Sequence, residues 1–150
     1  MVLFTAGLNT SEAFASQVQQ MSLIGPIARV LTFRSYEEEA PDLKVQVEIP
    51  SIETIQADLS GLAEQVNQQI YALCEAYVTE AKKHAEEYHQ AFLATGGTGE
   101  EWLQHDLQIR VGYEVKNQTD QYISLIVTGT ESWNGAGSSL RYYNLDLERR

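Results

Sequence analysis

The sequence predicts an α+β fold in which one long helix lies across one face of an antiparallel sheet, in the order β-β-α-β-β-β. Two segments of strand composition precede a long helical pattern, and three more follow it. The short connections favour antiparallel neighbours. A chain of 150 residues, 43% hydrophobic and 21% charged, is long enough to bury one such core.

The first two predicted strands form a hairpin. Residues 28–36 are rich in β-branched and aromatic side chains, and residues 43–49 alternate strictly between apolar and polar. In the second segment Leu43, Val45, Val47 and Ile49 share one face, which we expect to be buried. The acidic turn 37–42 connects the two strands.

The helix is predicted over residues 58–93, where apolar side chains recur at spacings of three and four. Asp58 is a suitable N-cap, and Gly96 and Gly97 predict the end. Such a helix would span roughly 54 Å, whereas a compact chain of this length is only about 38 Å across. The helix therefore overhangs the domain, kinks, or packs against something that this chain lacks.

Three strands are predicted after the helix, over residues 107–115, 122–128 and 140–147. A loop at 96–101 precedes them. The turns between them, at 117–120 and 133–137, are rich in Asn, Asp and Gly.

The charge is strongly one-sided, with 21 acidic and 10 basic residues and a net charge of −11. A basic face that could neutralise phosphates cannot be assembled, so nucleic acid is excluded as a partner. Anionic membrane surfaces repel the chain for the same reason. A basic macromolecule is the partner that this charge would attract.

No motif for catalysis is present, because the sequence lacks a nucleophile elbow, a P-loop and a His-Glu-x-x-His pair. We therefore expect no catalytic residue and no cofactor. Glu80, His84 and Glu87 can meet on the helix, but a solvated face with weak ion pairs is the ordinary interpretation, and no metal site is predicted. Cys74 lies among apolar residues and is expected to be a buried, inert thiol.

Recognition is the better supported chemistry. Trp133 and Asn134 lie in one strand-connecting turn and Gln118 and Thr119 in another, while Trp102 follows the helix. An exposed tryptophan on a rigid hairpin is typical of a binding anchor. These five residues are the candidate binding site, together with the acidic face. The alternative interpretation is that either tryptophan covers the core or a sheet edge.

The N-terminus has the pattern of a membrane exit. Residues 1–8 are apolar but too short to span a bilayer, and Ala13-Phe14-Ala15 is a small-x-small triplet of the kind that signal peptidase recognises. We interpret residues 1–21 as a membrane-exit stub with a short helix, and residues 22–150 as one α+β domain. The alternative is a short amphipathic N-terminal helix.

Several segments together resemble the extracellular region of bacterial anti-sigma factors of the V class. They are Ser22–Tyr36, Val47–Glu53, Val66-Asn67 with Ile70, Tyr122–Ile126, Gly135-Ala136 and Tyr143–Leu147. The resemblance covers roughly residues 9–147, and its motifs occur in the family's order.

This resemblance implies a non-enzymatic sensor at the extracytoplasmic face of a bacterial membrane. Members of that family hold a sigma factor inactive and bind lysozyme, and binding exposes a site to signal peptidase. Here Ala13, Ala15 and Ser16 would form that cleavage site. Many animal lysozymes are strongly basic, which suits a domain of charge −11.

Relatives of that family continue into a further half, so the resemblance also implies that this chain is the N-terminal half of a larger extracellular domain. The overhanging helix would then expose an apolar stripe and favour a homodimer. The alternative function is a cell-wall module like those that accompany polysaccharide deacetylases, in which Trp133 and Trp102 would stack on sugar rings.

Overall fold

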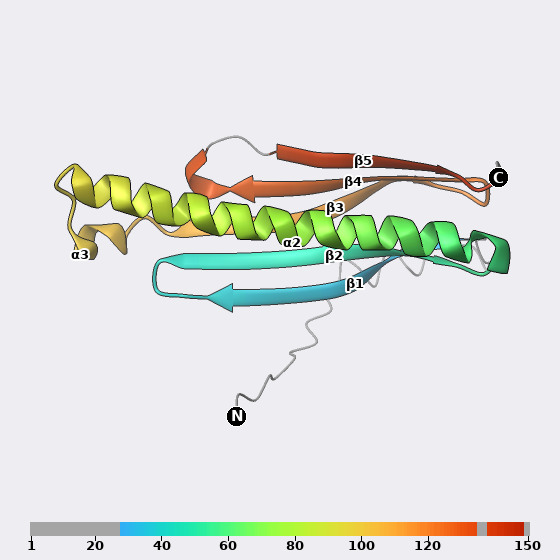
Figure 1. The fold of residues 1–150 in the computed structure, drawn as a ribbon, viewed down its shortest axis with the longest axis horizontal. Coiled ribbons are helices and arrows are strands. Elements are labelled where there is room, and N and C mark those ends of the chain that lie inside the picture. Colours follow the sequence, from blue (N-terminus) through green and yellow to red (C-terminus); the bar gives the residue numbers. More distant parts are fainter. Residues whose placement is uncertain (1–27, 135–137, 149–150) are drawn as a thin grey trace, which may run out of the picture.

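The computed structural model describes residues 28–134 and 138–148 and consists of one five-stranded sheet with one long helix (Figure 1). The strand order is β1-β2-β3-β4-β5, and helix α2 (Ala57–Ala94) lies along one face of the sheet. The α+β class and the predicted element order are confirmed. The strands are β1 (Ala28–Glu39), β2 (Leu43–Thr54), β3 (Leu107–Gln118), β4 (Tyr122–Glu131) and β5 (Ser138–Asp146), with a short helix α3 (Gly99–Trp102) and a 3₁₀ turn η1 (Ser132–Asn134) between them.

The sheet departs from the prediction in one respect, because β2 and β3 run parallel. The other three neighbouring pairs are antiparallel, as expected. The parallel pairing joins residues 43–47 to residues 107–111. Its cause is the crossover helix: α2 carries the chain back along the sheet, so β3 starts at the same end as β2 and runs the same way. The sheet is therefore mixed.

Both ends of α2 are defined by the backbone. The N-cap is Gln56 and not the predicted Asp58, which lies in the first turn, where its charge suits the helix dipole. At the other end Gly96 adopts φ +96°, and the amides of Gly96 and Gly97 bond to the carbonyls of Leu93 and Phe92, both over 3.1 Å. This is a Schellman motif, and it confirms the predicted glycine stop.

The main core lies between α2 and the sheet. Cys74 and Ile70 are fully buried on the helix, as the predicted apolar face requires, and burial raises the pKa of the Cys74 thiol to about 11. Within the described ranges no helix combines the length and the apolarity needed to cross a membrane. In this core α2 contributes Leu59, Ala63, Ile70, Cys74, Val78 and Ala81, and the sheet contributes Val45, Val47, Ile49, Ile109, Val111, Ile123, Leu125 and Val127.

The helix overhangs the sheet, which is one of the three arrangements that its length allows. Its 38 residues span about 57 Å, and its C-terminal end extends past the strands together with α3 (Figure 1). Trp102 of α3 covers part of this overhang and forms a second small core with Ala85 and Leu107, while Tyr88, Leu93 and Leu103 at the same end are exposed. Sequence reasoning read this segment as a loop, although Thr98 and Glu101 form a capping box that marks a helix start.

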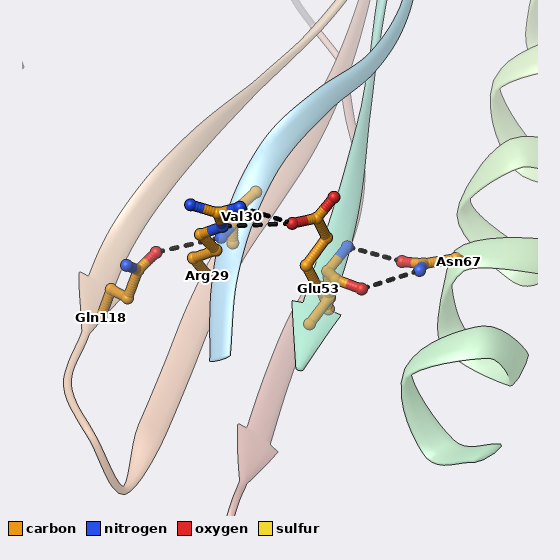
Figure 2. A network of polar contacts seen from close by, with 6 residues as sticks. Arg29, Val30, Glu53, Asn67 and Gln118 are labelled. Atoms are coloured by element: carbon orange, nitrogen blue, oxygen red, sulfur yellow. Dashed lines mark hydrogen bonds and ion pairs between the residues drawn. The ribbon is translucent and has the colours of Figure 1, made fainter. Parts of the chain in front are cut away.

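At the opposite end the two hairpins separate, and side-chain amides replace the missing strand partners (Figure 2). Beyond Val47 and Val111, β2 and β3 no longer pair. Asn67 of α2 accepts from the Ile52 amide over 2.7 Å and donates to the Ile52 carbonyl over 2.9 Å. Gln118 accepts from the backbone amide of Val30 over 3.2 Å. The opened sheet therefore keeps these backbone groups satisfied.

Candidate functional site

Negative charge is concentrated at the overhanging end of the molecule. Residues 37–44 and 80–106, which we call the acidic end, carry ten carboxylates and three lysines. Their formal net charge is −7, out of −11 for the whole chain. The sequence places these segments far apart, and the fold brings the β1–β2 hairpin end beside Lys82 of α2 and beside α3.

Ion pairs hold these segments together. Lys82 of α2 pairs with Glu38 of β1, and Lys44 of β2 lies 3.8 Å from Glu39 and 3.6 Å from Asp106. Lys83 lies 3.7 Å from both Glu80 and Glu87, so all three lysines of the acidic end already face carboxylates of this chain. These pairs are exposed and weak individually. With ten carboxylates and three lysines, the acidic end keeps its formal net charge of −7.

The acidic end rests on an aromatic cluster around Trp102. The Trp102 ring is stacked on His89 with 4.3 Å between centroids, and it meets Tyr88 and Phe92 at 5.3 and 5.6 Å. Its indole nitrogen donates to Asp42. The buried Trp102 ring is thus held by partly exposed rings, and such packing fixes the surface above it.

Two hollows open on either side of α3. One, of about 540 Å³, is lined by Phe92, the turn 95–97 and the side chains of Glu101, Gln104 and His105. The other, of about 440 Å³, lies between residues 39–44 of the hairpin turn and Leu103 and Asp106. The acidic end is thus charged and carries two open hollows on its surface.

A carboxylate–imidazole chain lies at the border of the acidic end. His84 of α2 lies between two carboxylates, with Nδ1 3.1 Å from Glu131 and Nε2 3.3 Å from Glu80. The hydrogen bond to Glu131 raises the pKa of His84 above its ordinary 6.5, and nearby Glu80 and Glu87 add to this. Glu131 is itself buried in the sheet. Among the described residues, no group of three or more such side chains is arranged to hold a metal.

Trp102 is not an exposed anchor, and that prediction is wrong. Its side chain is only 3% exposed, since it fills the gap between the overhanging helix and β3. The alternative interpretation, that this tryptophan covers the core, is the correct one. It also removes one of the two rings that the glycan-binding alternative would use for stacking.

The other predicted binding residues do not form one site. Trp133 is half-buried and packs against both cores, while Gln118 and Thr119 lie at the far end of β4 from it. Ten strand residues separate the two turns by about 30 Å. Gln118 bonds to Val30, and Thr119 accepts from the amides of Gln121 and Tyr122, so both organise the fold.

Several expectations fall outside the described residues. These are the side chain of Asn134, which ends η1, and the proposed cleavage site at Ala13, Ala15 and Ser16.

Comparisons with known proteins give a fold and no function. No family model matches the sequence, and no curated protein matches it. Among solved structures it is similar to a member of the DUF3298 family from Bacteroides fragilis, with a TM-score of 0.52 and 13% identity. The match covers 81% of this chain and 57% of that one, so this chain spans little more than half of its structural neighbour.

Proposed function

We propose that this domain is a non-catalytic recognition domain that binds a basic protein through its acidic end. The observation that carries the proposal is the concentration of −7 of the net charge in residues 37–44 and 80–106. In the finer form of the proposal, the domain is the extracytoplasmic sensor of a membrane-anchored regulator similar to the anti-sigma factors of the V class. Lysozyme is then the partner of first choice.

Charge and shape act together in this proposal. A surface of one sign steers an oppositely charged protein and raises the association rate, and it rejects acidic competitors. Steering alone gives little affinity at physiological salt, where the Debye length is about 8 Å. The two hollows beside α3 supply the close contacts that screening weakens least.

The test is calorimetric titration of this domain with hen lysozyme, at low and at physiological ionic strength. The proposal predicts saturable one-to-one binding that weakens as salt rises and persists at physiological salt. Binding that disappears at physiological salt would mean nonspecific attraction and would contradict the proposal. Salt-independent binding of cell-wall oligosaccharides, without binding of lysozyme, would favour the glycan-binding alternative instead.

The regulatory part of the proposal has a separate test. If partner binding exposes residues 13–16 to signal peptidase, Ala15→Trp in the membrane-anchored protein should block cleavage, because the small-residue pocket cannot accept an indole. Ala6→Trp, outside the triplet, is the control. Unchanged cleavage of Ala15→Trp would show that this segment is not the site, whether or not the domain binds lysozyme.

A further inference from the structure

The hollow at the C-terminal end of α2 has a defined chemical character. It is bounded by the Phe92 ring, the turn at Gly96 and Gly97, and the side chains of Glu101, Gln104 and His105. It is open to solvent and lies within the acidic end. Its two aromatic lining residues, Phe92 and His105, also contact the Trp102 ring.

The negative charge of this hollow is fixed in place. Oε2 of Glu101 accepts from the amide and the hydroxyl of Thr98, both over 2.9 Å, as part of the capping box of α3. These bonds hold the pKa of Glu101 below its usual range, so the carboxylate is ionised at neutral pH. An anchored carboxylate loses little conformational entropy when it binds a cation.

Two aromatic rings form walls of this hollow, and the glycine turn leaves space for one of them. The Phe92 ring lies 4.8 Å from the His105 ring at an interplanar angle of 73°. A Cβ at Gly97 would come within 2.2 Å of the Phe92 ring, so only glycine leaves room for the ring here. Nδ1 of His105 lies within hydrogen-bond distance of the carbonyls of Glu101 and Trp102, at 3.2 and 3.1 Å, and must donate to them. The neutral imidazole then keeps Nε2 as an acceptor.

The carboxyl end of α2 also favours a cation in this hollow. The last turn of α2 contains no basic residue, although the carboxyl end of a helix of 38 residues carries a partial negative charge. Helices commonly place Lys, Arg or His at this position. In this molecule the hollow lies where such a cation would be.

We propose that this hollow receives one cationic side chain, an arginine or a lysine, of the basic protein that binds the acidic end. The cation lies against the Phe92 ring and bonds to the Glu101 carboxylate, while Gln104 and His105 offer further acceptors. The identity of the partner rests on the proposed function, but the preference of the hollow for a cation does not.

The experiment is an NMR titration of the ¹⁵N-labelled domain with N-acetyl-arginine amide, compared with the neutral N-acetyl-glutamine amide. We expect saturable shifts for the arginine compound at the amides of Gly96, Gly97 and Gln104, and none for the glutamine compound. Glu101→Gln keeps the capping box, which accepts either residue, and removes only the charge. It should weaken binding about tenfold, the size expected for a charge-assisted bond.

Glu100→Gln is the matched control, since it removes the same charge from the neighbouring exposed position, outside the hollow. We expect at most about a twofold loss from it. Equal losses in the two variants, or shifts spread over the whole acidic end, would overturn the proposal. Phe92→Leu should also weaken the arginine compound, and a variant that binds it as well as the parent would remove the ring from the site.

Lysozyme titration of the same variants separates this inference from the proposed function. If lysozyme binds and Glu101→Gln behaves like Glu100→Gln, the hollow is not a cation receptor but the acidic end still binds. If the arginine compound fills the hollow and lysozyme does not bind, the hollow is a cation receptor and the proposed basic-protein partner is wrong.

Discussion

The indole nitrogen of Trp102 donates a hydrogen bond to Oδ2 of Asp42 over 3.0 Å, although 60 positions separate the two residues. This bond joins α3 to the turn between β1 and β2. Because the Trp102 ring is buried at the same place, the two segments that carry most of the excess negative charge are held in a fixed relation. The acidic end is therefore a built surface and not a chance accumulation of exposed carboxylates.

Removal of the Trp102 ring should destabilise the domain strongly. Trp102→Ala leaves a cavity in the second core and should lower the free energy of unfolding by about 3–5 kcal/mol. Urea denaturation followed by circular dichroism measures this. Leu103→Ala, at the neighbouring exposed position, should change it by less than about 0.5 kcal/mol. Similar values for both variants would show that Trp102 is not a core residue.

Replacement of Asn67 should destabilise the domain more than replacement of an ordinary polar surface residue. Asn67→Ala leaves the amide and the carbonyl of Ile52 without partners where β2 has left β3, and should cost about 2 kcal/mol of unfolding free energy. Gln68→Ala is the control, since the Gln68 side chain makes an exposed bond to Glu64 within the helix. A cost for Asn67→Ala no larger than for Gln68→Ala would mean that water replaces the amide at no loss.

The sequence predicted the elements well because their signals are local. Alternation at residues 43–49, helical spacing over 58–93 and the Gly96-Gly97 stop each depend on neighbours in the chain. The parallel pairing of β2 with β3 could not be read in this way. It depends on where a helix of 38 residues returns the chain, which is a property of the whole fold.

His84 should make stability depend on pH. Its pKa is raised in the folded chain, chiefly by the hydrogen bond to Glu131, so folding favours the protonated form. The stabilisation is complete below about pH 6.5 and is lost as the pH rises through the raised folded pKa. Melting temperatures of the parent and of His84→Gln should therefore be compared from pH 5 to 9. The parent should exceed the variant most at acid pH, and the difference should shrink toward pH 9.

Glu131→Gln serves as the second variant in that series. It keeps a hydrogen-bonding group beside His84 and removes the charge, so it should reduce the same pH-dependent difference. A His84→Gln protein whose melting temperature follows that of the parent at every pH would contradict the role assigned to this pair.

Gly129 should not tolerate a side chain. A Cβ there would come within 2.5 Å of the Tyr77 ring, which packs on β4 from α2. Gly129→Ala should therefore cost about 1–3 kcal/mol by overpacking. At Gly112, on the neighbouring strand, nothing lies within 4 Å of the added atom, so Gly112→Ala should be neutral or slightly stabilising. Thermal unfolding of the two variants tests this prediction. Equal melting temperatures would contradict the close packing of the Tyr77 ring on Gly129.

The candidate site was only partly visible in the sequence. The net charge predicted the sign of the partner, and that expectation underlies the proposed function. The location could not be predicted in this way, because the exposed polar turns that carry Gln118 and Trp133 have the stronger local signal of a binding site. A tryptophan in a polar segment looks the same in sequence whether it faces solvent or a helix overhang. The capping box at Thr98 and Glu101 was the signal that could have indicated α3 and a buried Trp102.

The role of the acidic end in binding a basic protein is tested most directly by comparing two variants that lose the same charge at different places. The first replaces Glu37, Glu39, Glu86 and Glu87 of the acidic end by Gln. The second neutralises four exposed acids outside it, by changing Glu48, Glu64 and Glu114 to Gln and Asp120 to Asn. Both have a net charge of −7, so general attraction to a basic protein is matched.

The measurement is the dissociation constant for hen lysozyme at physiological salt. We expect the acidic-end variant to bind about tenfold or more weakly than the parent, with a smaller salt dependence, while the affinity of the other variant changes by about twofold or less. Equal weakening of both variants, or no saturable binding by the parent, would contradict the claim that the acidic end recognises a basic partner.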